Sequence, residues 1–408
     1  MLWEIPKVEI TRHKLKNDLR IIFHRRELLT ATYRILIAHG YRNEQFPESV
    51  HLLEHMIFKP EERVFPIFQR IGGEINGYVS LDEFSVYWTI PKIFQDRAID
   101  GVRRIFIENH KYWTQATLER EKAVIIRELG ENFSNPARYI GIFLRKKVFG
   151  ENTPGTHSPK VVEKAFRNVT LNDVRNELQN LSPEDSVLSI VGDVDPNKLK
   201  AIEEWHGRKM GWNKLKIETE TGRHFKHMDI PMNYIAIGWV SASKEKTESE
   251  ILDLLGAILT AFPTSRLYKK LRLERGLVYY VEAFNVANID SGLFAIMTST
   301  EPRYTEEVIN IILQEIENII DEGPTEGEVE DMKNVFFGAL YSLTDSKSSL
   351  AGTLAYNELF FGNALRLYEK VTRVVQNLKP EDVQRATKNY LRPENSVICV
   401  LGKKNGHV

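Results

Sequence analysis

The sequence has a single cysteine, Cys399, among its 408 residues. One thiol excludes a disulfide within the chain and any zinc site that is built on several cysteine ligands. Cys399 stands in an apolar run with Val397, Ile398 and Val400. We therefore expect it to be a small buried side chain rather than a reactive group.

The sequence also lacks a charge excess and long hydrophobic runs. It carries 55 Lys and Arg residues against 56 Asp and Glu residues, a formal net charge of −1, which gives no support to a nucleic-acid partner. No stretch approaches the roughly 18 apolar residues that span a bilayer. The first residues, MLWEIPKVEITRHKLKNDL, have neither the apolar core nor the cleavage site of a secretory signal. We expect a cytoplasmic protein without a membrane or nucleic-acid partner.

What the sequence does contain is an internal repeat. Residues 181–192 read LSPEDSVLSIVG, and residues 391–402 read LRPENSVICVLG. Each copy follows a helical stretch and ends in a short apolar run bounded by polar turns, which is typical of a buried strand. The period is far too long for a solenoid. The repeat therefore favours two copies of one fold in tandem.

The repeat sets the expected domain organisation, namely an N-terminal domain at 1–205, a linker at 206–228 and a C-terminal domain at 229–408. Recurring helices and adjacent strands predict an α+β class, with a mainly antiparallel sheet packed with helices in each domain. For the first half, strands are expected at 18–24, 32–39, 74–80 and 83–91. Helices are expected there at 47–58, 92–110, 115–133 and 160–180.

A metal-binding pattern lies in residues 47–60, PESVHLLEHMIFKP. On a helix, His51 and His55 project from one face a single turn apart, a spacing that lets two imidazoles bind one tetrahedral zinc. Glu54 lies beside the same face, where it can reach a metal-bound water as a general base without binding the metal. This is the inverted order His-x-x-Glu-His. The alternative is a partly buried helix whose two histidines are satisfied by hydrogen bonds.

A third protein ligand is needed, and the candidates lie in LEREKAVIIRELGENF at 118–133. Glu121 and Glu128 are two helical turns apart on one face, with apolar residues between them. Carboxylates on such a face are costly to bury unless they are paired or bind a metal. A solvated charged stripe is the alternative. The spacing alone does not choose between Glu121 and Glu128.

A further candidate element is GGEINGY at 72–78, in which the glycine pair ends a short helix and leads into a strand. A purely structural turn is the alternative to a functional role. The stretch SRLYKKLRLERGLVYY at 265–280 contains Arg272 and Tyr279, for which a surface arginine and a core tyrosine are the alternative.

These motifs resemble the M16 metallopeptidase family, which includes pitrilysin, insulin-degrading enzyme and the mitochondrial processing peptidase, and the resemblance spans nearly the whole chain. HLLEHMIF is similar to the family's zinc helix, and EKAVIIRE at 121–128 to its downstream motif. The resemblance implies an M16/LuxS-metallohydrolase-like fold, Glu128 as the third zinc ligand, and Glu121 as a carboxylate that orients a ligand histidine.

The resemblance also implies substrate contacts. GGEINGYVS is similar to the strand along which the substrate adds as an extra β-strand, which points to Asn76, Gly77 and Tyr78. Gly77 departs from the alanine that is usual at this place, and FKP at 58–60 departs from the common Phe-Lys-Gly-Thr. Arg272 and Tyr279 match the family's Arg…Tyr element, which implies a grip on the substrate backbone or on the tetrahedral oxyanion.

The second half reads ILDLLGAIL at 251–259 where the first half has the zinc helix, and it has no histidine there. The resemblance therefore implies a degenerate C-terminal domain that serves substrate binding. It implies a Zn²⁺-dependent endopeptidase that cleaves peptides or unfolded segments inside a chamber made by a dimer, with Arg272 and Tyr279 reaching the partner's zinc. A homodimer is the simpler expectation, and a heterodimer with a related subunit is the alternative.

Two other functional classes remain open at this point. A non-catalytic M16-like subunit would shape or brace a complex, although such subunits usually lose zinc ligands. A zinc hydrolase of a non-peptide substrate is the third reading, because site chemistry does not fix the substrate.

Overall fold

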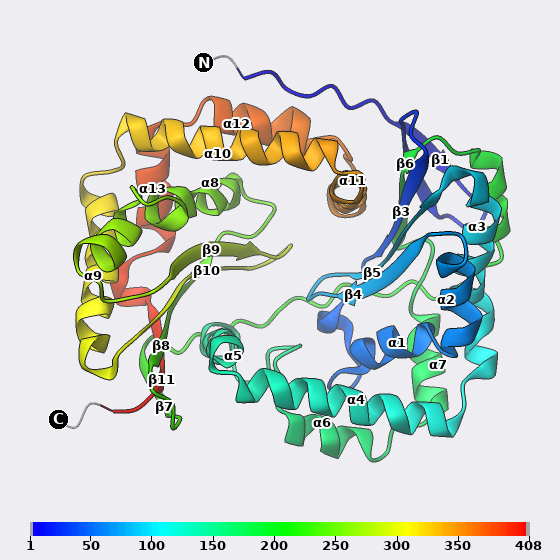
Figure 1. Cartoon of the computed structure of the whole chain (residues 1–408), viewed down its shortest axis with the longest axis horizontal. Helices are drawn as coiled ribbons and strands as arrows, with labels where there is room; N and C mark the ends of the chain where they lie inside the picture. Colours follow the sequence, from blue (N-terminus) through cyan, green and yellow to red (C-terminus); the bar gives the residue numbers. More distant parts are fainter. Residues whose placement is uncertain (1–2, 405–408) are drawn as a thin grey trace.

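A computed structural model describes residues 3–404 and contains two β-sheets, each built from one half of the chain (Figure 1). The strand order is β1-β2-β6-β3-β5-β4 in the first sheet and β7-β11-β8-β10-β9 in the second. The strands of the first sheet are β1 (Thr11–Lys14), β2 (Arg20–Arg25), β3 (Thr30–Ile37), β4 (Glu74–Val79), β5 (Phe84–Pro91) and β6 (Ser186–Gly192). Those of the second are β7 (Gly222–His227), β8 (Asn233–Ser241), β9 (Val281–Ala287), β10 (Gly292–Thr300) and β11 (Val397–Gly402).

The two sheets share one topology. Apart from β1, each position of the first sheet has a counterpart in the second, and the repeated sequences form β6 and β11 at equivalent places. In each sheet the repeat strand pairs parallel with one neighbour and antiparallel with the other. All other pairings are antiparallel. The predicted α+β class with two similar, mainly antiparallel sheets is confirmed.

The described α-helices are α1 (Ser49–Ile57), α2 (Glu61–Gln69), α3 (Gln95–Arg103), α4 (Gln115–Ser134), α5 (Pro136–Phe149), α6 (Pro159–Phe166) and α7 (Leu171–Gln179) in the first half. The second half has α8 (Thr247–Gly256), α9 (Thr305–Asp321), α10 (Glu326–Asp345), α11 (Lys347–Phe361), α12 (Thr372–Gln376) and α13 (Pro380–Tyr390). None of these helices combines the length and the apolar character that a membrane crossing requires.

Two details differ from the sequence expectations. The single helix expected at 160–180 is two helices, α6 and α7, because Thr170 and Asp173 form a capping box that starts a new helix. Part of the expected linker, Gly222–His227, is strand β7, which pairs parallel with β11 at the edge of the second sheet. The exact division at 1–205, 206–228 and 229–408 stays a prediction.

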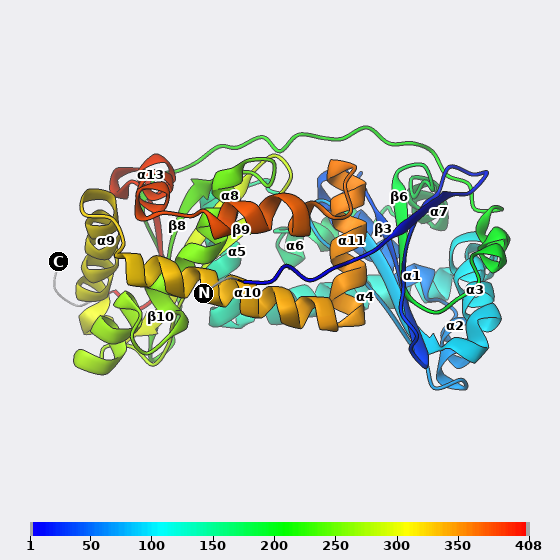
Figure 2. The ribbon, with the colours of Figure 1, turned by 90° about the horizontal axis from the view of Figure 1, so that it is seen from above.

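The two halves exchange a helix. α5 belongs to the first half in sequence but packs on β8 and β11, while α11 belongs to the second half and packs on β3 and β6. α4 leads from the first half toward α5, and α10 leads from the second half toward α11 (Figures 1 and 2). Each sheet therefore buries one face against a helix that the other half supplies.

The cores reflect this exchange. Leu354 of α11 shares one apolar cluster with Leu36 and Val187 of the first sheet. Leu144 of α5 shares another with Ala236 and Cys399 of the second sheet. Cys399 is fully buried, as the sequence predicts, and burial raises the pKa of its thiol to about 12.

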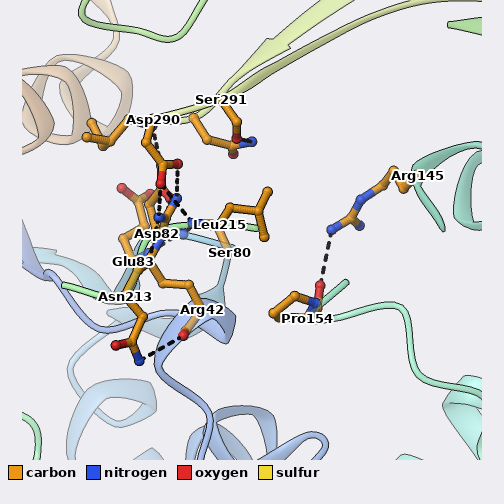
Figure 3. Close-up of polar contacts among 12 residues, drawn as sticks. Arg42, Ser80, Asp82, Glu83, Arg145, Pro154, Asn213, Leu215, Asp290 and Ser291 are labelled. Atoms are coloured by element: carbon orange, nitrogen blue, oxygen red, sulfur yellow. Dashed lines mark hydrogen bonds and ion pairs between the residues drawn. The ribbon is translucent and has the colours of Figure 1, made fainter. Parts of the chain in front are cut away.

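A buried ion cluster also joins the two halves (Figure 3). Arg42 follows β3, and its guanidinium bonds Asp82 of the first half and, with two N–O distances of 2.9 Å, Asp290 of the second. It donates to the carbonyl of Asn213 in the connecting segment at 2.9 Å and lies 4.3 Å from the ring centroid of Trp212. Such a bidentate pair fixes direction as well as distance, so the cluster sets the relative position of three chain segments.

Candidate metal centre

Helix α1 presents His51, Glu54 and His55 on one side because its other side is apolar. Val50, Leu52, Leu53, Met56 and Ile57 are fully buried in the core of the first half. With those positions turned inward, the two histidines lie one turn apart on the opposite side. Their side chains are 19% and 15% exposed, so both rings face a partly open site.

Helix α4 brings Glu128 to the same place. Glu128 Oε2 lies 3.6 Å from Nε2 of His51 and 3.6 Å from Nε2 of His55. The three potential ligand atoms all lie within 4.8 Å of one another, and the described residues form no other such group of three metal-binding side chains. The Glu128 side chain is 46% exposed, which leaves one side of the cluster accessible.

The far nitrogen of each imidazole is held by a carboxylate. His55 Nδ1 lies 3.1 Å from Glu121 Oε2, and His51 Nδ1 lies 3.0 Å from Glu48 Oε2. A carboxylate at Nδ1 fixes the tautomer that leaves Nε2 free as a ligand. Sequence spacing alone does not choose between Glu121 and Glu128 as the candidate third ligand. In the structure Glu128 faces both Nε2 atoms, whereas Glu121 faces the Nδ1 atom of His55.

Glu48 was not a candidate in the sequence analysis. It immediately precedes α1, at the N-cap position, where glutamate is not one of the preferred residues. Its position three residues before His51 was the available signal, because side chains three apart meet on a helix.

The cluster fits a zinc ion. Two imidazole nitrogens and one carboxylate oxygen are a donor set of zinc enzymes, and ligand atoms on one tetrahedral zinc lie about 3.3 Å apart. Glu128 Oε2 lies close to this distance from each Nε2 atom, at 3.6 Å, and all three ligand atoms lie within 4.8 Å of one another. Burial opposes protonation of His51, yet the carboxylates of Glu48, Glu54 and Glu128 outweigh it and raise the pKa of that imidazole. A site surrounded by these carboxylates is suited to binding a cation.

Glu54 lies beside the cluster without joining it. Its Oε2 is 3.9 Å from His55 Nε2, and its side chain is mostly buried. Burial raises the pKa of the Glu54 carboxyl, against the opposing effect of the two histidines. A raised pKa makes a carboxylate a better proton acceptor near neutral pH.

Glu121 is itself surrounded by positive groups. Its Oε1 lies 3.4 Å from Lys59 Nζ and 3.2 Å from Arg120 Nε. The side chain is almost fully buried. Its other oxygen, Oε2, accepts the hydrogen of His55 Nδ1.

Strand β4 passes directly beside the cluster and has one free edge, since it is the last strand of its sheet. A Cβ atom at Gly77 would lie 3.2 Å from Glu54 Oε1, so Gly77 faces the cluster. By strand alternation, Asn76 and Tyr78 face the other side of the sheet. Asn76 is exposed, and its side-chain oxygen accepts a hydrogen bond from the Gly77 amide at 2.8 Å.

Arg272 and Tyr279 lie together in the second half. The Arg272 guanidinium carbon is 5.0 Å from the ring centroid of Tyr279 and 5.0 Å from that of Tyr268. Tyr279 is 79% exposed. Within residues 3–404, no hydrogen bond or ion pair joins Arg272 or Tyr279 to His51, His55 or Glu128.

Comparison with known families gives one match. Residues 168–336 match the family described as Peptidase M16 inactive domain. This segment lies mostly in the second half and contains neither the histidine pair nor Glu128. The word "inactive" thus describes a part of the chain without the cluster.

Relatives with similar sequences extend over most of the chain. The uncharacterized zinc protease YmxG of Bacillus subtilis is 22% identical over 390 residues, which cover 92% of this chain and 93% of that protein. An uncharacterized zinc protease of Streptomyces coelicolor is 21% identical over 97% of this chain and 90% of its own length.

Solved structures share the fold. A protein described as a peptidase M16 inactive domain from Pseudomonas fluorescens superposes with a TM-score of 0.87 at 18% identity, covering 98% of this chain and 99% of that one. A protease from Helicobacter pylori gives a TM-score of 0.84 at 18% identity, covering 97% and 100% of the two chains. At this identity the likeness establishes the architecture alone.

Proposed function

We propose that this chain, which the family match and the named relatives identify as M16-like, is a zinc-dependent endopeptidase. The observation that carries the proposal is the convergence of His51, His55 and Glu128, with a carboxylate on the far nitrogen of each imidazole. A solvated charged stripe on α4 would not place one carboxylate oxygen 3.6 Å from both Nε2 atoms. The relatives are named zinc proteases, which agrees with this donor set.

The chain's own groups suit peptide hydrolysis. His51, His55 and Glu128 would hold a zinc ion, which would supply Lewis acidity and lower the pKa of water at the site. Glu54 accepts the proton of the attacking water on its carboxylate and returns it to the leaving amine. Its side chain is only 16% exposed and lies beside Gly77, which limits the solvent that would compete for that proton.

The free edge of β4 suits a peptide substrate. Unpaired N–H and C=O groups on an edge strand can pair with an extended chain. A Cβ atom added at Gly77 would lie 3.2 Å from Glu54 Oε1. A peptide that pairs with β4 would therefore pass close to Glu54, the proposed general base. Asn76, Gly77 and Tyr78 are the proposed contacts.

The proposal includes a dimer. Tyr279 is exposed and lies against the partly buried Arg272, and Leu273, the next residue in the chain after Arg272, is a second exposed apolar side chain. Exposed apolar side chains that gather at one place can mark an interaction site. We place this pair at the zinc centre of a second copy, where the guanidinium and phenol stabilise the oxyanion of the reaction. A related subunit that takes the place of the second copy is the alternative partner.

The test is Glu54→Gln in a quenched-peptide assay, with and without a chelator, together with a zinc analysis. We expect zinc binding to persist and turnover to fall by about 10²–10⁴-fold, because the proton acceptor is lost. The control is Glu62→Gln, which changes an exposed carboxylate on α2 and should leave turnover unchanged.

Each other result has a definite meaning. Full activity of Glu54→Gln would discard the assigned base. A wild-type protein that binds zinc but cleaves no peptide would favour the non-catalytic subunit. A protein without zinc would remove the enzymatic account.

A further inference from the structure

The residue before α1 adopts an unusual backbone conformation. Glu48 has φ 65° and ψ 22°, in the left-handed region. Among the described residues, Asp18 with φ 70° is the only other non-glycine residue with positive φ. This region is costly for a residue with a Cβ atom, and such outliers cluster at functional sites.

Glu48 also forgoes the ordinary role of its position. It is the N-cap of α1, yet its side chain accepts no hydrogen bond from the amides of the first turn. A capping side chain there would add stability to the helix. The Glu48 carboxylate instead lies 3.0 Å from His51 Nδ1 and is almost fully buried.

The turn that holds Glu48 is fixed by hydrogen bonds between neighbouring residues, one of which is held in turn by the distant His157. Glu44 Oε2 accepts the Glu48 amide hydrogen at 2.9 Å, and Glu44 Oε1 lies 2.6 Å from Nε2 of His157. Ser49 Oγ accepts the Gln45 amide hydrogen at 3.0 Å. The left-handed residue is therefore locked from both sides of the turn.

We infer that Glu48 is a positioning residue of the metal centre, whose left-handed backbone aims its carboxylate at His51 and keeps Nε2 turned toward Glu128. The inference rests on the proposed zinc site. The left-handed backbone at Glu48 costs free energy, and in return His51 is held in the orientation that a ligand needs. With ordinary backbone geometry and a conventional N-cap at this position, His51 Nδ1 would lack its carboxylate partner.

The test compares Glu48→Ala, Glu48→Gly and Glu48→Gln in the full-length protein. The zinc dissociation constant is measured by competition with a chromophoric chelator, and the melting midpoint is measured on the metal-free protein. Ala and Gly both remove the carboxylate, so both should weaken zinc binding by about 10–100-fold. Only Gly is at ease at this φ, so metal-free Glu48→Gly should melt above metal-free Glu48→Ala.

Two further variants separate positioning from general damage. The side-chain oxygen of Glu48→Gln can still accept the hydrogen of His51 Nδ1, so its zinc affinity should lie between those of the wild type and Glu48→Ala. Asp18→Gly relaxes the other left-handed residue far from α1 in the β1–β2 turn, and it should bind zinc like the wild type. If Glu48→Gly folds stably and still binds zinc weakly, a loss of stability does not explain the weak binding.

The inference fails if Glu48→Ala binds zinc as tightly as the wild type does. It also fails if Glu48→Gly melts no higher than Glu48→Ala, because the turn would then carry no strain. A wild-type protein that binds no zinc would overturn the proposed function and this inference together, whereas the first two outcomes would leave the proposed function intact.

Discussion

Glu83 is a buried carboxylate that the proposed chemistry does not use. It lies in the turn between β4 and β5, where Tyr78 donates its hydroxyl hydrogen to one oxygen, while the other oxygen is buried without a hydrogen-bond partner. Burial raises the pKa of the Glu83 carboxyl to about 6, despite the opposing effects of Tyr78 and Arg34. The folded protein therefore takes up a proton there at a pH where the unfolded chain has lost it.

This difference predicts a pH-dependent stability. Because the folded-state pKa lies above the unfolded value, the contribution of Glu83 is favourable at low pH and is lost as the pH rises through about 6. The change in the free energy of unfolding of the metal-free protein on replacing Glu83 with Gln should therefore be more favourable at pH 7.5 than at pH 4.5. The difference should be about 2 kcal/mol at most. Urea unfolding of both proteins at the two pH values measures this difference.

The matched control for Glu83 is Glu74→Gln, which changes an exposed carboxylate at the start of strand β4. It should alter the free energy of unfolding equally at both pH values. The same result for Glu83→Gln would show that burial does not perturb Glu83 in the folded protein.

At the scale of elements, the exchanged helices couple each half to the other. Gly238 of β8 leaves room for Leu144, since a Cβ there would lie 2.9 Å from a Leu144 methyl. In the same way a Cβ at Gly352 of α11 would lie 2.9 Å from the Arg34 guanidinium of β3. At both contacts a glycine lets a side chain from the other half of the sequence approach closely. Part of the face of each sheet is therefore covered by a helix from the other half.

The exchange predicts a crossed effect of two core mutations. Leu354→Ala in α11 and Leu144→Ala in α5 should each cost about 2–5 kcal/mol, because both side chains are fully buried. Hydrogen exchange should rise in β3 and β6 for Leu354→Ala, and in β8 and β11 for Leu144→Ala. The packing would be refuted if each mutation loosened only the sheet of its own half of the sequence.

At the scale of the whole molecule, the proposed dimer assigns the catalytic groups to different copies. Arg272 contacts the rings of Tyr268 and Tyr279, and the exposure of Tyr279 leaves this element available to a second copy. In a symmetric dimer each copy would give its histidine pair to one site and its Arg–Tyr pair to the other.

Mixing two inactive variants tests this assignment. Glu54→Gln and Arg272→Ala should each be nearly inactive alone. If the groups act across the interface, a mixture that exchanges subunits contains heterodimers with one intact site, so about a quarter of the wild-type activity should return. Recovery would be absent if Arg272 serves the zinc of its own chain, and a monomer with full activity would contradict the dimer itself.

Several features followed from the sequence because they depend on neighbours along the chain. The spacing of His51 and His55 on one helical face, the strands β2 to β5 and the equivalent strands β6 and β11 all rest on local periodicity. The α+β class followed from the order of these elements. The break between α6 and α7 departs from the helix expected at 160–180, because the capping box of Thr170 and Asp173 starts a new helix inside a pattern that is apolar at helical spacing on both sides.

Other features were decided only by tertiary packing. The sequence placed Glu121 and Glu128 on one face of α4, but the angle at which α4 meets α1 determines that Glu128 faces both Nε2 atoms. The exchange of α5 and α11 likewise depends on contacts between residues far apart in the chain. Periodicity fixes distances within an element, whereas distances between elements depend on how their apolar surfaces fit together, and no local pattern contains that information.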